Sequence, residues 1–269
     1  MSAVLEFDRV NFAYPGSDVS ALTELSLSIS EGESLALLGP NGAGKTTALR
    51  LAMALLHPVS GEVRVMGKAT VGRMPEDVAG NAGFLFQRPE HQLFASSVRE
   101  DVAFGPRQLG QDNIDEVVER ALDQLELGDV ASVHPYDLPA PRRRLVALAG
   151  VLALRPRLLL LDEPTAGLDR HSRLLVRRAL AAHRAEAGAV VAVSHDGEFV
   201  LEALDRAVTL EHGRVVGDGG SAEALGRLGA PPAPAWARLV AQMGAAPAQW
   251  RFEPAVEFVA MRCRAAPDA

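Results

Sequence analysis

Short runs of apolar residues recur along the chain and predict the strands of a central sheet. The runs that are almost entirely apolar lie at residues 34–38, 82–86, 158–161 and 190–193. Such runs are typical of strands buried on both faces of a parallel sheet. Residues 4–12 alternate between apolar and polar and predict an edge strand, and residues 62–66 predict another short strand.

Helical spacing of apolar residues appears between these runs. Residues 46–56 form an apolar helical stretch that ends before Pro58. Residues 114–125 show the clearest helical period, and Asp112 or Asn113 is the expected cap. Strands that alternate with helices predict an α/β fold.

The pattern weakens toward the C-terminus. His212 and Gly213 separate two short apolar segments and predict a hairpin turn. From residue 230 to 248 the composition shifts to alanine and proline, which indicates a linker or a loosely helical appendage. We therefore expect the main domain to end near residues 215–225.

Composition limits the class of protein. The chain has 269 residues, enough for one large domain or two modest ones, and its formal charge of −7 argues against a general nucleic-acid binder. Its single cysteine, Cys263, permits no intrachain disulfide and suggests a reducing compartment. Charged residues at the start argue against a signal peptide, and the longest apolar stretch, residues 145–154, is about half a bilayer span. If the protein works at a membrane, we expect another chain to span it.

A glycine-rich segment follows the predicted strand at residues 34–38. It consists of Gly39, Pro40, Asn41, Gly42, Ala43, Gly44, Lys45, Thr46 and Thr47. This spacing matches the phosphate-binding loop, in which backbone N–H groups surround a phosphate, the lysine reaches the terminal phosphates and the hydroxyl after it contacts Mg²⁺. An ordinary glycine turn before a helix is the alternative, but the flanking strand and helix favour binding of ATP with Mg²⁺.

Two acidic residues follow another buried strand. The run at 158–161 leads directly into Asp162 and Glu163. Beside a phosphate-binding loop, Asp162 is expected to hold Mg²⁺ and Glu163 to activate the attacking water. Alternatively, the pair caps the helix that follows Pro164.

Together these motifs resemble the ATPase subunit of ATP-binding-cassette (ABC) transporters, in order over roughly residues 4–220. The resemblance implies a RecA-like P-loop NTPase core with an antiparallel β subdomain and an α-helical subdomain at about 90–155. It makes residues 1–220 the ATP-binding domain and 221–269 a small C-terminal extension.

The resemblance also implies roles for isolated residues. Gln87 would sense Mg²⁺ and the attacking water, His195 would contact the terminal phosphate, and Tyr14 would stack on adenine. Asp169 would touch the opposite subunit of a cassette dimer. Taken alone, His195 is more typical of a surface or structural residue, and Tyr14 is more typical of a core residue.

Residues 88–94 and 98–106 are similar to the energy-coupling-factor subgroup, whose ATPases drive import of cobalt, nickel or vitamins. This similarity implies a transmembrane coupling subunit that contacts residues 88–106, a substrate-binding membrane subunit, and a peripheral position on the cytoplasmic face of the membrane. It implies no nucleic-acid partner. The alternative for this region is a generic helical subdomain. Residues 221–269 would then help to pair the ATPases. The alternative is that Trp236, Trp250 and Phe252 only anchor this appendage to the domain.

One stretch departs from the family. Where cassette ATPases carry the signature Leu-Ser-Gly-Gly-Gln, this chain has Leu138, Pro139, Ala140, Pro141 and Arg142. The serine hydroxyl is missing and two prolines lack a backbone N–H, so donors that would bind the partner's ATP are lost. A composite site built with this signature is expected to be slow or only structural.

The arginines at positions 142–144 have two interpretations: one supplies charge to the partner's phosphate, or all are a solvated helix start. A complete nucleotide side beside a damaged signature favours a heterodimer with a second ATPase over a homodimer. A regulatory subunit and a soluble cassette ATPase outside transport are the alternative functions.

Overall fold

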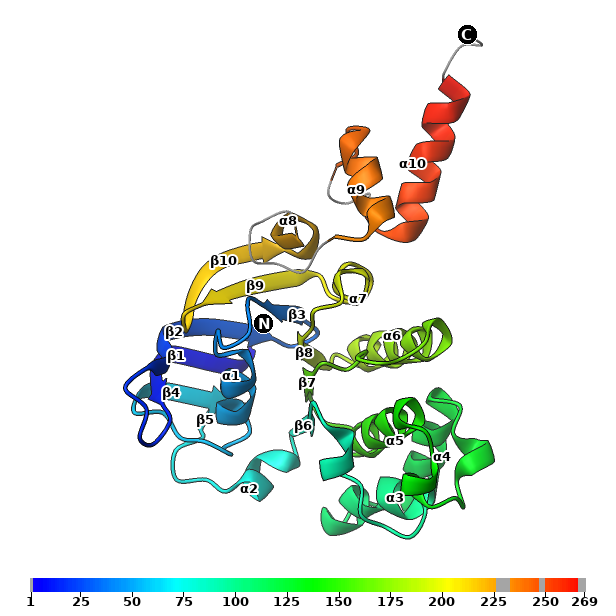
Figure 1. Cartoon of the computed structure of the whole chain (residues 1–269). Coiled ribbons are helices and arrows are strands. Elements are labelled where there is room, and N and C mark those ends of the chain that lie inside the picture. The colour runs from blue at the N-terminus through cyan, green and yellow to red at the C-terminus, as the bar shows by residue number, and fades with distance from the viewer. Residues whose placement is uncertain (1, 226–232, 247–249, 266–269) are drawn as a thin grey trace.

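The computed structural model describes residues 2–225, 233–246 and 250–265, and these contain two sheets with helices around them (Figure 1). The smaller sheet is antiparallel, with strand order β2-β1-β4-β5. Its strands are β1 (Ala3–Ala13), β2 (Ser20–Ser30), β4 (Ser60–Val65) and β5 (Lys68–Ala69). The antiparallel subdomain implied by the resemblance is therefore confirmed.

The edge position predicted for residues 4–12 is wrong. β1 pairs with β2 on one side and with β4 on the other, so it is an inner strand. Its alternation arises because one face packs on the core while the other faces outward. The long strand β2 was not predicted, since its apolar residues alternate with serine, threonine and glutamate.

The larger sheet has strand order β10-β9-β3-β8-β7-β6, and all its pairings are parallel except that of β9 with β10. Its strands are β3 (Ser34–Leu38), β6 (Ala82–Leu85), β7 (Leu158–Asp162), β8 (Ala189–Val193), β9 (Arg206–Glu211) and β10 (Arg214–Gly220). The predicted parallel strands and the hairpin at His212 and Gly213 are confirmed.

Both faces of this sheet are buried, as the uniformly apolar runs require. In β3, Leu35 and Leu37 belong to the cluster shared with the antiparallel sheet and the first helix. Ala36 and Leu38 belong to the cluster on the opposite face, to which most of the later helices contribute. Close packing on both faces holds the sheet in place, so the residues at its strand ends have well-defined positions.

The helices follow the predicted alternation. They are α1 (Lys45–Ala52), α2 (Pro75–Ala79), α3 (Val98–Gln108), α4 (Ile114–Gln124), α5 (Ala140–Ala153), α6 (Arg170–Ala185), α7 (Gly197–Ala203), α8 (Ser221–Leu225), α9 (Ala235–Gln242) and α10 (Phe252–Ala265), with 3-10 turns at Pro89–His91, Gly128–Val130 and Pro135–Asp137. α1 is shorter than the predicted 46–56, because Ala54 takes a left-handed backbone with φ +54°. Asn113 does precede α4, but it is left-handed and its side chain makes no capping hydrogen bond.

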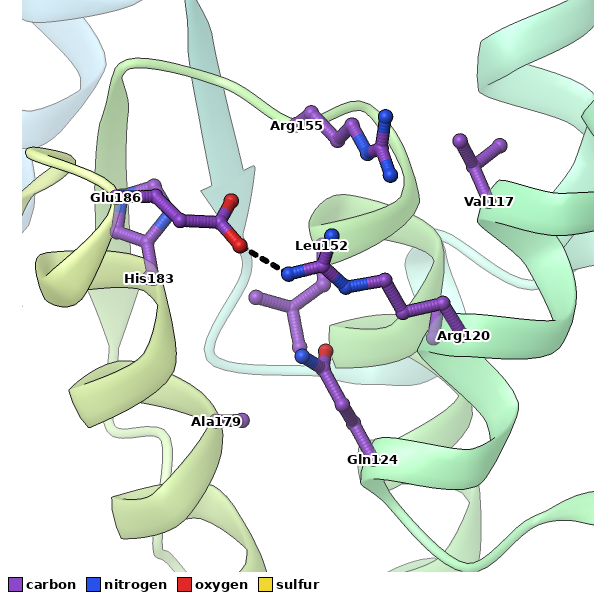
Figure 2. Close-up of a pocket in the computed structure, with 9 residues that line it drawn as sticks. Val117, Arg120, Gln124, Leu152, Arg155, Ala179, His183 and Glu186 are labelled. Carbon is purple, nitrogen blue, oxygen red and sulfur yellow. Dashed lines mark hydrogen bonds and ion pairs between the residues drawn. The ribbon is translucent and has the colours of Figure 1, made fainter. Parts of the chain in front are cut away.

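Helices α3, α4 and α5 pack together as the helical subdomain, on the lower right of Figure 1. Its boundary with α6 encloses a small polar cavity of about 30 Å³ (Figure 2). Arg120 and Gln124 of α4 face His183 and Glu186 from the end of α6, and Arg120 forms an ion pair with Glu186.

The C-terminal helices α9 and α10 stand away from the sheets, with α10 pointing outward (Figure 1). Arg251, just before α10, donates hydrogen bonds to the Leu201 carbonyl (3.1 Å) and to Asp205 (2.6 Å). The Phe252 amide donates to Glu202 at 2.6 Å. The segment is therefore attached to α7 and to the loop that follows it.

Of the three aromatic residues expected to anchor this segment to the domain, Trp236 and Trp250 pack against the domain's large hydrophobic cluster. Trp236 packs edge-on against Phe252, with ring centroids 5.8 Å apart, and the Trp250 indole donates to the Ala245 carbonyl at 3.2 Å. Part of the alanine- and proline-rich stretch lies outside the described residues. Within the described residues, no helix is long and apolar enough to cross a membrane.

Candidate functional site

Four neighbouring strands of the larger sheet deliver the predicted site residues to one edge. β3 pairs with β8, β8 with β7, and β7 with β6, all in parallel. Their carboxyl ends therefore lie side by side. They lead into the glycine-rich loop, His195, Asp162 with Glu163, and Gln87 respectively. Ligands of open α/β sheets bind at this edge.

The glycines of the loop are required by their surroundings. Gly39 and Gly44 have φ of +132° and +98°. A Cβ on Gly39 would lie 2.0 Å from the Leu210 carbonyl oxygen, and one on Gly44 would lie 2.4 Å from the Ala21 carbonyl oxygen. Only glycine satisfies both the backbone angle and the space, so the loop can wrap closely around a ligand.

Lys45 is held inside this loop. Its Nζ donates to the carbonyls of Gly39 (2.8 Å) and Pro40 (2.9 Å), and its side chain is buried. Burial lowers the pKa of Lys45, while the charges of Glu163 and Asp162 oppose that shift. The ammonium group is thus held in the loop by the loop's own carbonyl groups.

Thr46 and Asp162 meet across the site. The Thr46 hydroxyl donates to Asp162 Oδ2 at 2.9 Å. Burial raises the pKa of Asp162, and the hydrogen bond from Thr46 and the charges of Arg50 and Lys45 oppose the shift. A hydroxyl and a carboxylate in contact are hard oxygen ligands of the kind that Mg²⁺ prefers.

Glu163 has an unfavourable backbone conformation and a largely buried carboxylate. Its φ is +55°, which is unfavourable for a residue with a side chain, and its Oε1 atom is buried without a hydrogen-bond partner among the described residues. Burial and the charge of Asp162 raise the pKa of Glu163 to about 6, although the His195 backbone amide donates to Oε2 at 3.3 Å. A carboxylate with a raised pKa is well suited to accept a proton near neutral pH.

His195 lies beside this carboxylate. Its Nε2 is 3.5 Å from Glu163 Oε1. Burial and the charge of Lys45 lower the pKa of His195, so the ring is neutral at pH 7. The alternative that Asp162 and Glu163 cap the next helix is wrong, because Asp169 caps α6 by accepting from the Ser172 amide at 2.7 Å.

Tyr14 reaches the site from the end of β1. Its hydroxyl is 3.0 Å from Thr47 Oγ1, and its ring packs edge-on against Phe12. The ring is partly exposed, at 38%. This exposure argues against the core-packing alternative and leaves a face on which a planar base can stack.

The structure brings almost all predicted residues to one cavity of about 540 Å³. Its predicted lining residues are Tyr14, Asn41, Gly42, Ala43, Gly44, Lys45, Thr46, Thr47, Gln87, Asp162, Glu163 and His195. Gly39 and Pro40 contribute through the carbonyls that hold Lys45. The segment of residues 17–21, which also lines the cavity, was not predicted, since a turn brings it there from the start of β2.

The donor set fits Mg²⁺ with a nucleoside triphosphate. The first N–H groups of α1 have no partner inside the helix and point toward the loop, and Lys45 adds a positive charge. The Thr46 hydroxyl and Asp162 would hold the metal, and the unpaired Oε1 of Glu163 is available to a water. Among the described residues, no group of three or more histidine, cysteine, aspartate or glutamate side chains is arranged to hold a metal ion by itself.

The signature segment lies where α5 begins. Pro139 occupies the N-cap position without a capping side chain, and α5 starts at Ala140. The neighbouring arginines are engaged within the chain. Arg142 pairs with Asp129 at 2.9 Å, and the Arg143 guanidinium lies over the Tyr136 ring at 5.7 Å.

Arg144 was missed as a site residue. Its guanidinium donates to the carbonyls of Glu163 and Gln87, both at 3.0 Å. Its sequence signal was present only as one of three consecutive arginines, and nothing in that run distinguishes the third.

Comparison with known families and proteins agrees with this site. The family model described as ABC transporter matches residues 22–166. A cobalt import ATP-binding protein of Rhodobacter capsulatus is 40% identical over 84% of this chain and 81% of that protein. A nickel import ATP-binding protein of the same organism is also 40% identical, over 84% of this chain and 93% of that protein. The energy-coupling factor transporter ATP-binding protein of Symbiobacterium thermophilum is 40% identical over 78% and 75%.

Solved structures give the same result for the fold. The cbiO1 protein of Clostridium perfringens, part of a transporter complex, superposes with a TM-score of 0.75 at 30% identity and covers 84% of this chain and 92% of that one. A cassette dimer bound to ADP and phosphate gives 0.74 at 24% identity, over 81% and 98% of the two chains. One longer relative, a putative ABC transporter ATP-binding protein of Bifidobacterium longum, is matched over only 29% of its length.

Proposed function

Since this chain belongs to the ABC transporter family of ATP-binding proteins, we propose that it hydrolyses ATP to drive a membrane importer of the energy-coupling-factor type. The observation that carries the proposal is the convergence of Lys45, Thr46, Asp162, Glu163 and His195 on one cavity at the sheet edge. Cobalt, nickel or a vitamin is the proposed cargo. The relatives' names support the metal ions.

Each residue has a proposed task in hydrolysis. Lys45 neutralises phosphate charge, and Thr46 with Asp162 holds Mg²⁺, which when bound further neutralises that charge. Glu163 accepts a proton from the attacking water at its unpaired Oε1. Neutral His195, whose Nε2 lies 3.5 Å from that Oε1, donates from Nε2 toward the reacting phosphate.

Three further residues belong to the proposed nucleotide-binding site: Gln87, Tyr14 and Asp169. Gln87 lines the cavity and follows β6, so it lies between the site and the helical subdomain. Tyr14 stacks on the base. The carboxylate of Asp169 caps α6, so its contact with an opposite subunit would involve the rest of its loop.

A groove on the other side of Gln87 supports docking of a transmembrane partner. It has a volume of about 340 Å³ and runs between β6, α3 and α5. Phe94 and Phe104 form an edge-on pair at its mouth, and they are 62% and 44% exposed. Exposed aromatic pairs are characteristic of protein interfaces. The proposed position is therefore peripheral, on the cytoplasmic face of the membrane, with a coupling subunit on this groove and a substrate-binding membrane subunit beyond it.

The start of α5 supports a heterodimer in which this chain supplies the weaker signature. Pro139 and Pro141 provide no backbone N–H, and the N-cap has no side-chain acceptor or donor in use. A composite site that needs this segment is slow, whereas the site around Lys45 and Glu163 works when a second ATPase supplies an intact signature. A regulatory subunit with weak hydrolysis is the second candidate and depends on the same observation.

Three measurements test the proposal. The full chain should bind Mg-ATP, and Lys45→Ala should remove binding. Hydrolysis by the chain alone should be slow and should rise when the membrane subunits and a second ATPase are added. Fast turnover in a homodimer, abolished by Glu163→Gln, would rule out the heterodimer.

Stimulation of hydrolysis by nucleic acid or ribosomes, without any membrane partner, would instead favour a soluble ATPase outside transport.

A further inference from the structure

Two strands that carry site residues separate just before the site. β6 and β7 pair in parallel as far as Leu85 and Leu161, which is the last pair of their register. Gln87 and Glu163 each lie two residues beyond that pair. The strand ladder thus ends before it reaches the residues whose relative position matters for hydrolysis.

Arg144 bridges this gap. From α5, its Nη1 donates to the Glu163 carbonyl and its Nη2 donates to the Gln87 carbonyl, both at 3.0 Å. The two nitrogens of one planar guanidinium therefore hold equivalent positions on the two diverging strands. Such a contact requires two N–H donors at a fixed separation, which we call the Arg144 fork. The single ammonium nitrogen of lysine does not provide them.

The carbonyl that Arg144 holds belongs to a strained residue. Glu163 has a left-handed backbone with φ +55°, which is unfavourable for a residue with a side chain. That conformation aims its carboxylate toward Lys45 and His195, and it persists only where neighbouring contacts enforce it. The contacts present are the Glu163 amide to Val193 (3.0 Å), the Ala166 amide to the Glu163 carbonyl (3.2 Å) and the Arg144 fork.

We propose that Arg144 is a positioning residue for ATP hydrolysis, which fixes the backbones of Gln87 and Glu163 relative to each other from the start of α5. This inference rests on the proposed function of the same site. Because α5 belongs to the helical subdomain, the fork forms only while that subdomain lies against the ends of β6 and β7. The relative position of the proposed general base and Gln87 therefore depends on the position of α5.

The charge of Arg144 has a separate effect. The half-buried guanidinium faces the carboxylates of Glu90, Glu163 and Asp162. Replacing arginine by lysine keeps the charge and removes the fork, so the two effects can be distinguished.

The first test uses the nucleotide-free full chain. Arg144→Met and Arg144→Lys should each raise backbone amide exchange about tenfold, in residues 85–89 and 162–167 together. Arg120→Met is the matched control, since Arg120 also joins the helical subdomain to the core but pairs with Glu186 far from the site. It should leave exchange in both segments unchanged. Unchanged exchange in both Arg144 variants would overturn the inference.

The second test is single-turnover hydrolysis of Mg-ATP with protein in excess, in the assembly in which the wild-type chain is active. Both Arg144 variants should lose about 100-fold in rate, because small misplacements cost that much. Their affinity for Mg-ATP should stay within about threefold of wild type, as for a group that acts only on the reaction step.

The outcomes separate the two proposals. Normal hydrolysis in Arg144→Met, or a loss of affinity equal to the loss of rate, overturns the positioning role and leaves the proposed function intact. A wild-type chain that hydrolyses no ATP in any assembly overturns the proposed function, and the positioning role with it.

Discussion

Replacing Glu163 by glutamine should stabilise the nucleotide-free protein while it removes the proposed base. Burial raises the pKa of this carboxyl from 4.5 to about 6, so the ionised form is less favourable in the folded state than in the unfolded chain. Below pH 4.5 the group is protonated in both states and has no such cost. As the pH rises from 4.5 through 6, the folded state loses stability, and above pH 6 the full loss of about 2 kcal/mol is present.

Glutamine is neutral at every pH and can still accept the hydrogen bond from the His195 amide. At pH 8, Glu163→Gln should therefore raise the free energy of unfolding by about 2 kcal/mol, and at pH 5 by less than about 1 kcal/mol. Urea unfolding of the full chain without nucleotide measures both values. Glu211→Gln, which changes an exposed carboxylate at the end of β9, is the control and should have no effect at either pH. An equal gain at both pH values, or a loss at pH 8, would refute the burial argument.

Other predictions concern the reaction, the loop and the partner surface. Hydrolysis should fall as the pH drops through about 6, since Glu163 must be ionised to accept a proton, and a rate that is constant down to pH 5 would contradict this. Gly44→Ala should abolish Mg-ATP binding, because its Cβ would meet the Ala21 carbonyl, whereas Gly42→Ala meets no atom within 4 Å and should weaken binding less; calorimetric titration of both variants decides. Phe94→Ser should reduce transport in cells without changing Mg-ATP affinity, and normal transport would count against the proposed docking groove.

The sequence predicts well those parts of the site whose structure is determined by residues close together in the chain. The glycine-rich loop needs particular residues at fixed spacing, because backbone angles and close contacts at Gly39 and Gly44 admit nothing else. The acids after β7 and the histidine after β8 were predicted from strand ends. Parallel pairing then brings those ends together without further information.

The parts that sequence did not predict depend on distant partners. Whether β1 is an edge or an inner strand is decided by β4, which pairs with it from about 55 residues away, and alternation alone is the same in both cases. Arg144 reaches carbonyls 19 and 57 positions away, and a backbone acceptor leaves no trace in the sequence. Asn113 has the right position for a cap but the wrong backbone angle.

The C-terminal helix α10 is attached to the ATP-binding domain near its first residues. The helix projects into solvent, while its base is fastened through Arg251 and Phe252 to α7, which begins two residues after His195. A partner that moves α10 in an assembly would therefore act on α7 and on the loop that holds His195, at a distance from the cavity itself.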